Sequence, residues 1–562
     1  MTDLTEQAPP SEDDTFRRKA TTLSVALLAL ALITRAVITF TKAYAQDDFY
    51  WWYFAWLRST PLVPGRDYYL PNVTPLSELA APLFRWCHES FLPFDIARVI
   101  MFAVGLALTW ACYQITRLLG GSVLWSVIAA NGVSWQYQFL KRIGDIRGDQ
   151  ISMLFLMLAV IVLLKSEGRR RALWSGFCCG ASVAVAFKLT IAAPFVGIGL
   201  LLGAEKRIRD AFLFALTFVI APTAYFGSRI AIDGYPNFAS VFAGIFNALD
   251  SAKAQHMTVL YRFFSIESAV LTSPLTWAAV FAGGCAFLLP SGPLTRRRRA
   301  YVVLATGFVM LFVYTNVFLF PYNYVILVPS LIPFIGGVSL LRFSRRFMQW
   351  AAVLVPISGV VGGTYAVRDV LPDRASTQRA AIRWIWSVTD KNDAIFDWQG
   401  TVAWRPTTYH WMIYSGAISR YESGWFTAAD EMQRAQVKMI VDNYRVTWIS
   451  ERDTAWAQAH FARVNGCILV PGWVATRTEL QSGKAIDAFL ENDEYVLQPS
   501  GTRGVLIDGK PVTDRVRLTR GPHELGAQTA AELPPSIALV RMTAKMVANP
   551  MPCTSVLINP AN

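Results

Sequence analysis

The chain has 562 residues, of which 54% are hydrophobic and 16% are charged, and its mean hydropathy is +0.35. A soluble globular protein is usually less apolar and more charged, so this composition indicates a polytopic membrane protein. The net charge of +13 does not indicate nucleic-acid binding, because the basic residues cluster in short loops between apolar segments, as in the cytoplasmic loops of membrane proteins.

The first apolar element covers residues 21–41. It follows an acidic tail, residues 1–20, that ends with Arg17, Arg18 and Lys19. Basic residues before a first span predict that the tail is cytoplasmic. No small-residue cleavage site precedes residue 41, so we expect an uncleaved transmembrane helix rather than a signal peptide. Residues 42–94 then form a long external loop.

The segment 172–203 lies between the basic clusters SEGRRR (166–171) and AEKRIR (204–209). Both clusters should be cytoplasmic, so the chain must cross the membrane an even number of times between them. One helix of this length would measure about 48 Å, well beyond the roughly 30 Å core of a bilayer. We therefore expect two short helices here, with an outer turn near Phe187 and Lys188.

The remaining spans follow the same pattern of apolar runs and inner basic clusters. We predict them at 95–117, 122–139, 150–165, 210–230, 268–290, 300–318, 324–341 and 347–366. The predicted fold is a polytopic α-helical membrane protein with about 11 transmembrane helices in residues 21–366 and a second external loop at 231–267. One basic stretch, KRIGDIRGDQ (140–149), falls outside in this topology, which either weakens the topology or indicates a chemical role for these charges.

Residues 367–562 differ in composition and are predicted to form an external, periplasmic C-terminal domain. Apolar runs of strand length occur at 394–400 and 441–450, and residues 428–440 have a helical pattern. From residue 494 to 525, apolar and polar residues alternate between Gly and Pro turns, which is typical of an antiparallel sheet. We expect an α/β unit followed by an all-β unit. Cys467 and Cys553 either pair in an oxidising compartment or remain buried free thiols.

Polar side chains from separate loops gather at the outer membrane boundary in this topology. Asp47 and Asp48 follow the first span and precede an aromatic run. The other members are Arg66, Asp67 and Tyr68, then Arg142, Asp145, Arg147 and Asp149, then Lys188, and finally Asn316, Tyr322, Asn323 and Tyr324. Charges near hydrocarbon are costly and are usually functional.

These residue types suit a lipid substrate that carries a phosphate and a sugar. Carboxylates can deprotonate an acceptor hydroxyl or hold a divalent cation. Arg and Lys can bind a phosphate and stabilise it as a leaving group. Aromatic rings suit both a membrane interface and a sugar face. Purely structural roles stay open: a solvated helix end for Asp47 and Asp48, a helix cap for Asp149, snorkelling for Lys188, and an interfacial belt for the aromatic residues.

These motifs together resemble the C-type (GT-C) glycosyltransferases, nearest to the bacterial aminoarabinose transferases and protein O-mannosyltransferases. The resemblance rests on the acidic pair Asp47–Asp48, on GRDYYLP (65–71), on RGD (147–149), on Lys188 and on FPYNYVILVPSLIP (320–333). Their order along the chain carries it, since none of the motifs is specific alone. The resemblance covers residues 1–366 and is weaker over 367–562. Asp48 departs from the Glu that is common at the second acidic position.

The resemblance implies an inverting transfer of a sugar from a polyprenyl-phosphate donor to a hydroxyl of a lipid, glycan or protein. The reaction would occur at the periplasmic face of the bacterial cytoplasmic (inner) membrane, among membrane lipids. No nucleotide cofactor is expected, because the sequence contains neither a Walker A motif nor a Rossmann glycine motif after a strand.

The resemblance also implies a role for each candidate residue. Asp47 is the expected catalytic base, assisted by Asp48. Metal dependence stays open, because lone carboxylates can serve either as a base or as ligands; Asp47 and Asp149 are the candidate ligands for a divalent cation, Mg or Mn. The donor phosphate would be bound by Lys188, Arg142 and Arg147, and the sugar or substrate by Arg66, Asp67, Tyr68, Asp145, Asp149, Tyr322 and Tyr324.

Two other functions fit parts of the sequence. A transporter or flippase of lipid-linked sugars would explain the spans and the outer charges, but it predicts midplane polar groups and internal repeats, which are not evident in the sequence. A non-catalytic, glycan-binding membrane scaffold would use the external domain and predicts that the loop acids are dispensable. The large one-sided external domain favours the enzyme.

Overall fold

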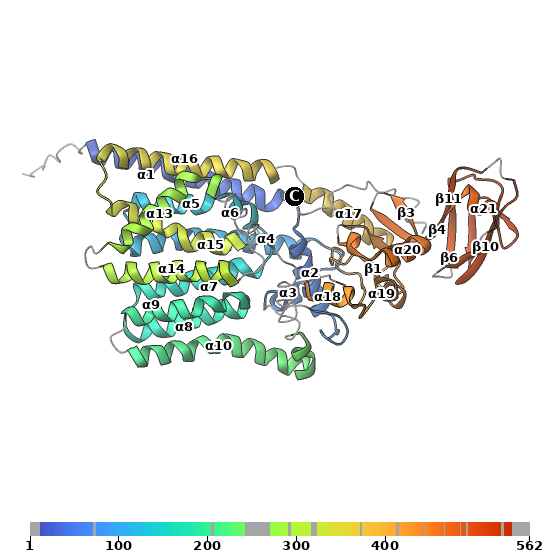
Figure 1. Cartoon of the computed structure of the whole chain (residues 1–562), viewed down its shortest axis with the longest axis horizontal. Coiled ribbons are helices and arrows are strands. Elements are labelled where there is room, and N and C mark those ends of the chain that lie inside the picture. Colours follow the sequence, from blue (N-terminus) through green and yellow to red (C-terminus); the bar gives the residue numbers. More distant parts are fainter. Residues whose placement is uncertain are drawn as a thin grey trace, which may run out of the picture.

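The computed structural model describes residues 12–70, 75–203, 207–241, 270–289, 294–315, 323–370, 374–411, 415–443, 445–465, 467–483, 485–489, 493–529 and 533–541. Figure 1 shows a helical bundle and, beyond one end of it, a C-terminal region of shorter helices and strands. Two further helices, α2 (Gln46–Ser59) and α3 (Pro75–Trp86), lie between the bundle and the C-terminal region.

Within the described residues, each predicted span is largely helical. The bundle consists of α1 (Glu12–Thr41), α4 (Leu92–Leu118), α5 (Val123–Trp135), α6 (Tyr137–Arg142), α7 (Gly148–Lys165), α8 (Gly168–Val185), η1 (Phe187–Ala192), α9 (Ala193–Gly203), α10 (Arg207–Asp233), α13 (Pro274–Leu288), α14 (Thr295–Thr315), α15 (Tyr324–Leu331), η3 (Ile332–Leu340) and α16 (Arg345–Val370). Among the described residues, six helices are long and apolar enough to cross a membrane, and shorter apolar helices accompany them. The chain therefore has a multi-pass helical membrane domain, and the exact number of crossings remains a prediction.

The central helices are apolar on all sides and pack closely. In α5 every residue from Trp125 to Trp135 is buried. Small residues bring α13 and η3 together, since a Cβ added to Gly283 would lie 1.9 Å from the carbonyl oxygen of Phe334. Such close backbone approach is typical of membrane helices, which associate by packing rather than by a hydrophobic driving force.

The turn predicted near Phe187 and Lys188 is present, because α8 ends at Val185 and η1 leads the chain into α9. The stretch 140–149 connects α6 to α7. It lies beside the start of α2, where the backbone N–H of Ile146 donates to the carboxylate of Asp48. Two loops that the sequence placed in the outer layer are therefore in contact.

The C-terminal region begins with α17 (Arg374–Val388). The strand predicted at 394–400 is limited to β1 (Ile395–Phe396). Beyond it the carboxylate of Asp397 accepts hydrogen bonds from the backbone N–H groups of Gln399, Gly400 and Thr401. These bonds fold the chain into a turn, which a strand pattern does not reveal.

The predictions for 428–440 and 441–450 are each wrong in part. α19 (Ala428–Arg434) stops early, and β2 (Met439–Val441) follows it. Strand β2 ends because the side-chain oxygen of Asn443 accepts the backbone N–H of Arg445 at 2.8 Å and turns the chain. The short helix η4 (Val446–Trp448) then replaces the expected strand. The remaining helices are α18 (Ser415–Glu422), α20 (Glu451–His460) and α21 (Arg477–Gln481).

The strands of the described residues form two sheets. The larger has seven strands in the order β1-β2-β4-β11-β6-β9, with β3 paired to β4, and the smaller has the order β5-β10-β7-β8. The further strands are β3 (Phe461–Asn465), β4 (Ile468–Thr476), β5 (Ala485–Phe489), β6 (Asp493–Gln498), β7 (Val505–Ile507), β8 (Lys510–Val512), β9 (Arg515–Leu518), β10 (Gly521–Ala527) and β11 (Ser536–Arg541). Strand β4 pairs with β2 at its start and with β11 along its second half. The expected α/β and all-β units are therefore joined through one shared strand.

Cys467 is disulfide-bonded and is therefore not the buried free thiol of the other alternative. Cys553, its expected partner, lies outside the described residues. The free cysteines are Cys87, Cys112, Cys178, Cys179 and Cys285.

Candidate active site

Helix α2 begins with two acids, and the structure gives them different surroundings. Asp48 is 1% exposed. Its carboxylate accepts hydrogen bonds from the backbone N–H of Ala45 at 2.9 Å and from that of Ile146 at 2.5 Å. Burial and the neighbouring Asp145 carboxylate raise the pKa of Asp48 to about 7, against the effect of nearby cations. Asp48 therefore caps α2 and ties it to the turn before α7.

Asp47 lies at one end of a row of four side chains with alternating charge. We call this row, formed by Asp47, Arg147, Asp149 and Lys188, the charged line. Its carboxylate forms an ion pair with Nη1 of Arg147, and Nε of Arg147 donates to Oδ2 of Asp149 at 3.0 Å. The other oxygen of Asp149 lies 2.9 Å from Nζ of Lys188. Nζ of Lys188 also donates to the side-chain oxygen of Asn323 at 3.0 Å. Residues from α2, the start of α7, η1 and the start of α15 thus meet in one layer.

The ends of this charged line are open and its centre is buried. The side chains of Asp47 and Lys188 are 29% and 28% exposed, whereas those of Arg147 and Asp149 are 12% and 10% exposed. With all four groups ionised, two positive and two negative charges cancel. The four charges therefore balance one another, while the two ends of the line remain partly accessible to a ligand.

Arg142 and Asp145 form a second cluster. Asp145 is 2% exposed and forms an ion pair with Lys42, while Nη1 of Arg142 lies 3.5 Å from the other carboxylate oxygen. Nζ of Lys42 also donates to the carbonyl oxygen of Lys141 at 2.8 Å. These bonds hold the turn that carries Ile146. The sequence reasoning did not single out Lys42, which directly follows α1.

The GRDYYLP motif forms a compact turn. Arg66 pairs with Asp67 at 2.7 Å, and Asp67 also accepts the backbone N–H of Val63 at 2.7 Å. Gly65 makes the turn with a φ of +79°. Tyr68 is carried into the core, where it is 2% exposed. A role of these residues in sugar binding remains a prediction.

Tyr324 is 3% exposed and directly follows Asn323, the hydrogen-bond partner of Lys188. Three further residues singled out from the sequence, Pro71, Asn316 and Tyr322, lie outside the described residues. Their roles remain predictions.

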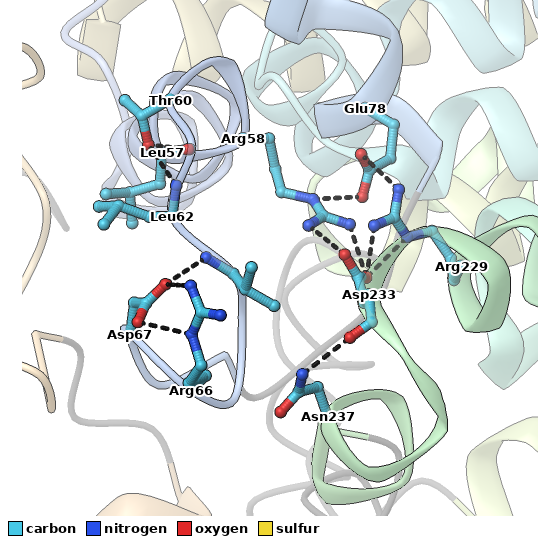
Figure 2. A network of polar contacts seen from close by, with 11 residues as sticks. Leu57, Arg58, Thr60, Leu62, Arg66, Asp67, Glu78, Arg229, Asp233 and Asn237 are labelled. Atoms are coloured by element: carbon cyan, nitrogen blue, oxygen red, sulfur yellow. Dashed lines mark hydrogen bonds and ion pairs between the residues drawn. The ribbon is translucent and has the colours of Figure 1, made fainter.

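A second buried network lies at the opposite end of α2 (Figure 2). Nη1 and Nη2 of Arg58 donate to the two carboxylate oxygens of Asp233, both at 2.8 Å, and Nε donates to Glu78 at 2.8 Å. Arg229 contacts the same two acids, at 3.1 Å to Glu78 and 3.0 Å to Asp233. This ring ties α2 to α3 and α10. The sequence reasoning missed it, although the spacing of Arg229 and Asp233 is that of a helical ion pair.

The aromatic run of α2 does not form the interfacial belt that the sequence left open as one alternative. Every residue from Phe49 to Phe54 is at most 9% exposed. The rings pack against the bundle side through Phe84 and Phe94 and against the C-terminal region through Trp411. The run therefore forms the core between α2 and the domain that covers it.

Comparison with solved structures identifies the fold of the chain. ArnT from Cupriavidus metallidurans bound to undecaprenyl phosphate matches with a TM-score of 0.52 at 12% identity, over 80% of this chain and 98% of that chain. The chain has the ArnT fold, a C-type glycosyltransferase fold. The apo state of the same ArnT gives the same TM-score and coverage at 11% identity. No family model and no curated relative matches the sequence.

An oligosaccharyltransferase from Archaeoglobus fulgidus, solved with Zn and sulfate, matches with a TM-score of 0.49 at 13% identity. The match covers 77% of this chain and 71% of that chain. The likeness to ArnT is one of fold, and it confirms the C-type fold that the order of motifs predicted.

Within this C-type fold, cationic side chains already contact both carboxylates, Asp47 and Asp149, that were expected to bind a divalent cation. Arg147 contacts both carboxylates, and Lys188 pairs with Asp149. Among the described residues, no group of three or more His, Cys, Asp or Glu side chains could hold a metal ion. The cation therefore remains a prediction, and the reaction proposed for the charged line is derived without one.

Proposed function

We propose that the chain is an inverting glycosyltransferase that moves a sugar from a polyprenyl-phosphate donor to an acceptor hydroxyl. The charged line Asp47–Arg147–Asp149–Lys188 is the observation that carries this proposal. ArnT, which has the same fold, was solved bound to undecaprenyl phosphate. The reaction takes place at the periplasmic face of the inner membrane, with residues 21–366 as the membrane domain and 367–562 as the periplasmic domain.

Asp47 is the base. The oxygen of the acceptor hydroxyl attacks the anomeric carbon from the side opposite the phosphate, and its proton passes to the carboxylate of Asp47. The new glycosidic bond forms as the bond between the anomeric carbon and the phosphate oxygen breaks. The electron pair leaves with the polyprenyl phosphate, so the configuration inverts. Asp47 is suited to this role because its side chain is 29% exposed, unlike the buried Asp48.

The two charge changes of this step compensate each other. Asp47 goes from −1 to neutral as it takes the proton, and the phosphate gains one negative charge as it becomes a leaving group. Arg147, which is paired with Asp47 before the reaction, then turns its guanidinium to the phosphate. Proton transfer and leaving-group stabilisation are therefore coupled through one side chain.

Lys188 provides the second positive charge for the donor phosphate. Asp149 holds it at 2.9 Å and holds Arg147 at 3.0 Å through its other oxygen. Asp149 thus fixes the spacing of the two cations that grip the phosphate. Arg142, whose Nη1 lies 3.5 Å from the carboxylate of Asp145, is the further candidate for the phosphate and also holds the turn before α7.

A transfer assay tests the proposal. Purified protein in detergent is given a panel of polyprenyl-phosphate sugars with a lipid extract as acceptor, with and without divalent cation. Release of polyprenyl phosphate that is abolished in Asp47→Asn supports the proposal. Absence of release from every donor, together with movement of lipid-linked sugar across liposomes, would instead establish the transporter.

A further inference from the structure

The first helix of the C-terminal region contacts the backbone just before the proposed base. The side-chain oxygen of Gln378, on α17, accepts the backbone N–H of Tyr44 at 2.6 Å, and its Nε2 donates to the carbonyl oxygen of Tyr44 at 3.3 Å. Gln378 is 1% exposed. A buried side chain that satisfies both backbone groups of one residue fixes that residue in place.

The ring of Tyr44 is held as firmly as its backbone. Arg379, which follows Gln378 on α17, donates to the Tyr44 hydroxyl and pairs with Asp95 of α4. The guanidinium of Arg98 lies 3.8 Å from the centroid of the Tyr44 ring. Tyr44 is completely buried as a result. Only Ala45 and Gln46 separate it from Asp47, so the anchor lies within one helical turn of the proposed base.

The C-terminal region also contacts the middle of α2 through Arg405 and Trp411. The hydroxyl of Tyr53 donates to the carbonyl oxygen of Arg405 at 2.8 Å. The ring of Trp411 lies 4.7 Å from that of Tyr53, and its Nε1 donates to the carbonyl oxygen of Tyr69 at 3.0 Å. Gly400 leaves room for this contact, since an added Cβ would lie 2.6 Å from the Trp411 ring.

Arg405 is itself held by several hydrogen bonds, which fix the loop that contacts α2. It is 1% exposed, and its guanidinium bonds to Glu89 at 2.7 Å and to the side chain of Thr389 at 2.8 Å. It also donates to the carbonyl oxygens of Trp386 and Thr389. The loop that covers α2 is thus braced against α17 and against the turn that precedes α4.

We propose that the C-terminal region is a structural part of the catalytic centre, with Gln378 as a positioning residue for Asp47. Gln378 acts through Tyr44 and sets where α2 begins. The contacts of Tyr53 with Arg405 and Trp411 set the rotation of the same helix. This inference rests on the proposed function for its effect on catalysis, but its effect on the 42–50 segment is independent of any reaction.

Two measurements on the full-length protein test this role. Hydrogen–deuterium exchange of the peptide covering 42–50 is compared among wild type, Gln378→Ala, Gln378→Glu and Gln433→Ala. Gln433 is an exposed residue of α19 and controls for the substitution itself. Gln378→Glu keeps the acceptor for the Tyr44 N–H but loses the donor to its carbonyl oxygen, so it should give an intermediate result. The same variants are then assayed for transfer.

We expect faster exchange at 42–50 in Gln378→Ala, and a kcat that falls by about 100-fold, as a displacement of about 1 Å at a reacting group can cause. The KM for the donor should change much less, because Lys188 and Arg147 stay in place. Unchanged exchange in Gln378→Ala would overturn the proposal, as would a full kcat with increased exchange. A wild-type protein that transfers no sugar would defeat the proposed function, while the exchange result would still decide the anchoring of Tyr44.

Discussion

The carboxylate of Asp47 and the guanidinium of Arg147 form an ion pair in which both side chains keep some contact with solvent, at 29% and 12% exposure. The pair between Arg58 and Asp233 is more enclosed, with both side chains 7% exposed. The two pairs lie at opposite ends of α2. In the proposed reaction the open pair exchanges partners with the substrate, whereas the enclosed pair ties α2 to α10.

Asp47→Asn should reduce kcat by about 10²- to 10⁴-fold, which is the usual contribution of general-base catalysis. The amide of Asn cannot take up the proton of the attacking hydroxyl. The thermal unfolding temperature should stay near that of wild type, since the side chain is partly exposed. Asp442→Asn, which alters a surface acid paired with the exposed Arg463, is the matched control and should leave kcat unchanged. Equal activity of Asp47→Asn and the control would rule out Asp47 as the base.

Arg147→Lys tests the bridging role of the guanidinium. Arginine reaches Asp47 through Nη1 and Asp149 through Nε, and a lysine ammonium cannot reproduce this fixed fork. We expect kcat to fall by about tenfold or more, since each lost 1.4 kcal/mol of transition-state stabilisation is tenfold in rate. Product inhibition by added polyprenyl phosphate should weaken in parallel. Arg515→Lys, at an exposed surface pair, serves as the control, and inhibition as strong as in wild type would contradict phosphate binding by Arg147.

The ring in Figure 2 predicts a change in stability. Arg58→Met leaves Glu78 and Asp233 with Arg229 as the remaining cation of the ring. Breaking one partner of a buried ion pair typically costs about 3–5 kcal/mol, so the unfolding temperature measured in detergent should fall clearly. Asp233→Asn should give a loss of the same sign, and the double variant should lose less than the sum of the two. Additive losses would show that the two side chains are not coupled.

The sequence was sufficient to predict a multi-pass helical domain, because apolar length and basic clusters are local signals. The predicted topology also groups Asp47, Arg147, Asp149 and Lys188, since it assigns loops to one side of the membrane or the other. Which of these side chains touch, and the pairing of Asp145 with Lys42, depend on distances of a few ångströms that no spacing encodes.

Contacts between segments that are distant in the chain could not be predicted from the sequence. The bonds between Gln378 and Tyr44 join parts of the chain that only tertiary packing brings together. For the same reason the aromatic run of α2 resembled an interfacial belt, whereas the C-terminal region covers it. The strand predicted at 441–450 is wrong because the side-chain oxygen of Asn443 accepts the backbone N–H of Arg445. This side-chain bond competes with strand pairing, and the pattern of apolar residues does not reveal it.

The smaller sheet should be sensitive to pH through His523 on β10. Its Nδ1 lies 2.7 Å from the carboxylate of Asp508 and its Nε2 lies 2.9 Å from the carbonyl oxygen of Thr519. Both partners are acceptors, so both ring nitrogens donate and the imidazolium is the matching form. Burial alone would lower the pKa of His523, but the hydrogen bonds to Asp508 and Thr519 and the charge of Asp508 raise it above its ordinary value.

The direction of the pH effect follows from that raised pKa. The stabilising contribution of His523 is fully present below the pKa of an unfolded histidine, near 6.5, and is lost as the pH rises through the folded pKa. The loss should be at most about 1 kcal/mol, because Asp508 is exposed and such pairs are screened by solvent. Hydrogen exchange of peptides from β7 and β10 in wild type and His523→Gln, compared at each pH, measures it. Wild type should exchange more slowly than the variant at pH 6 and approach it at high pH, whereas a difference that persists unchanged to high pH would show that the charge of His523 does not stabilise the sheet.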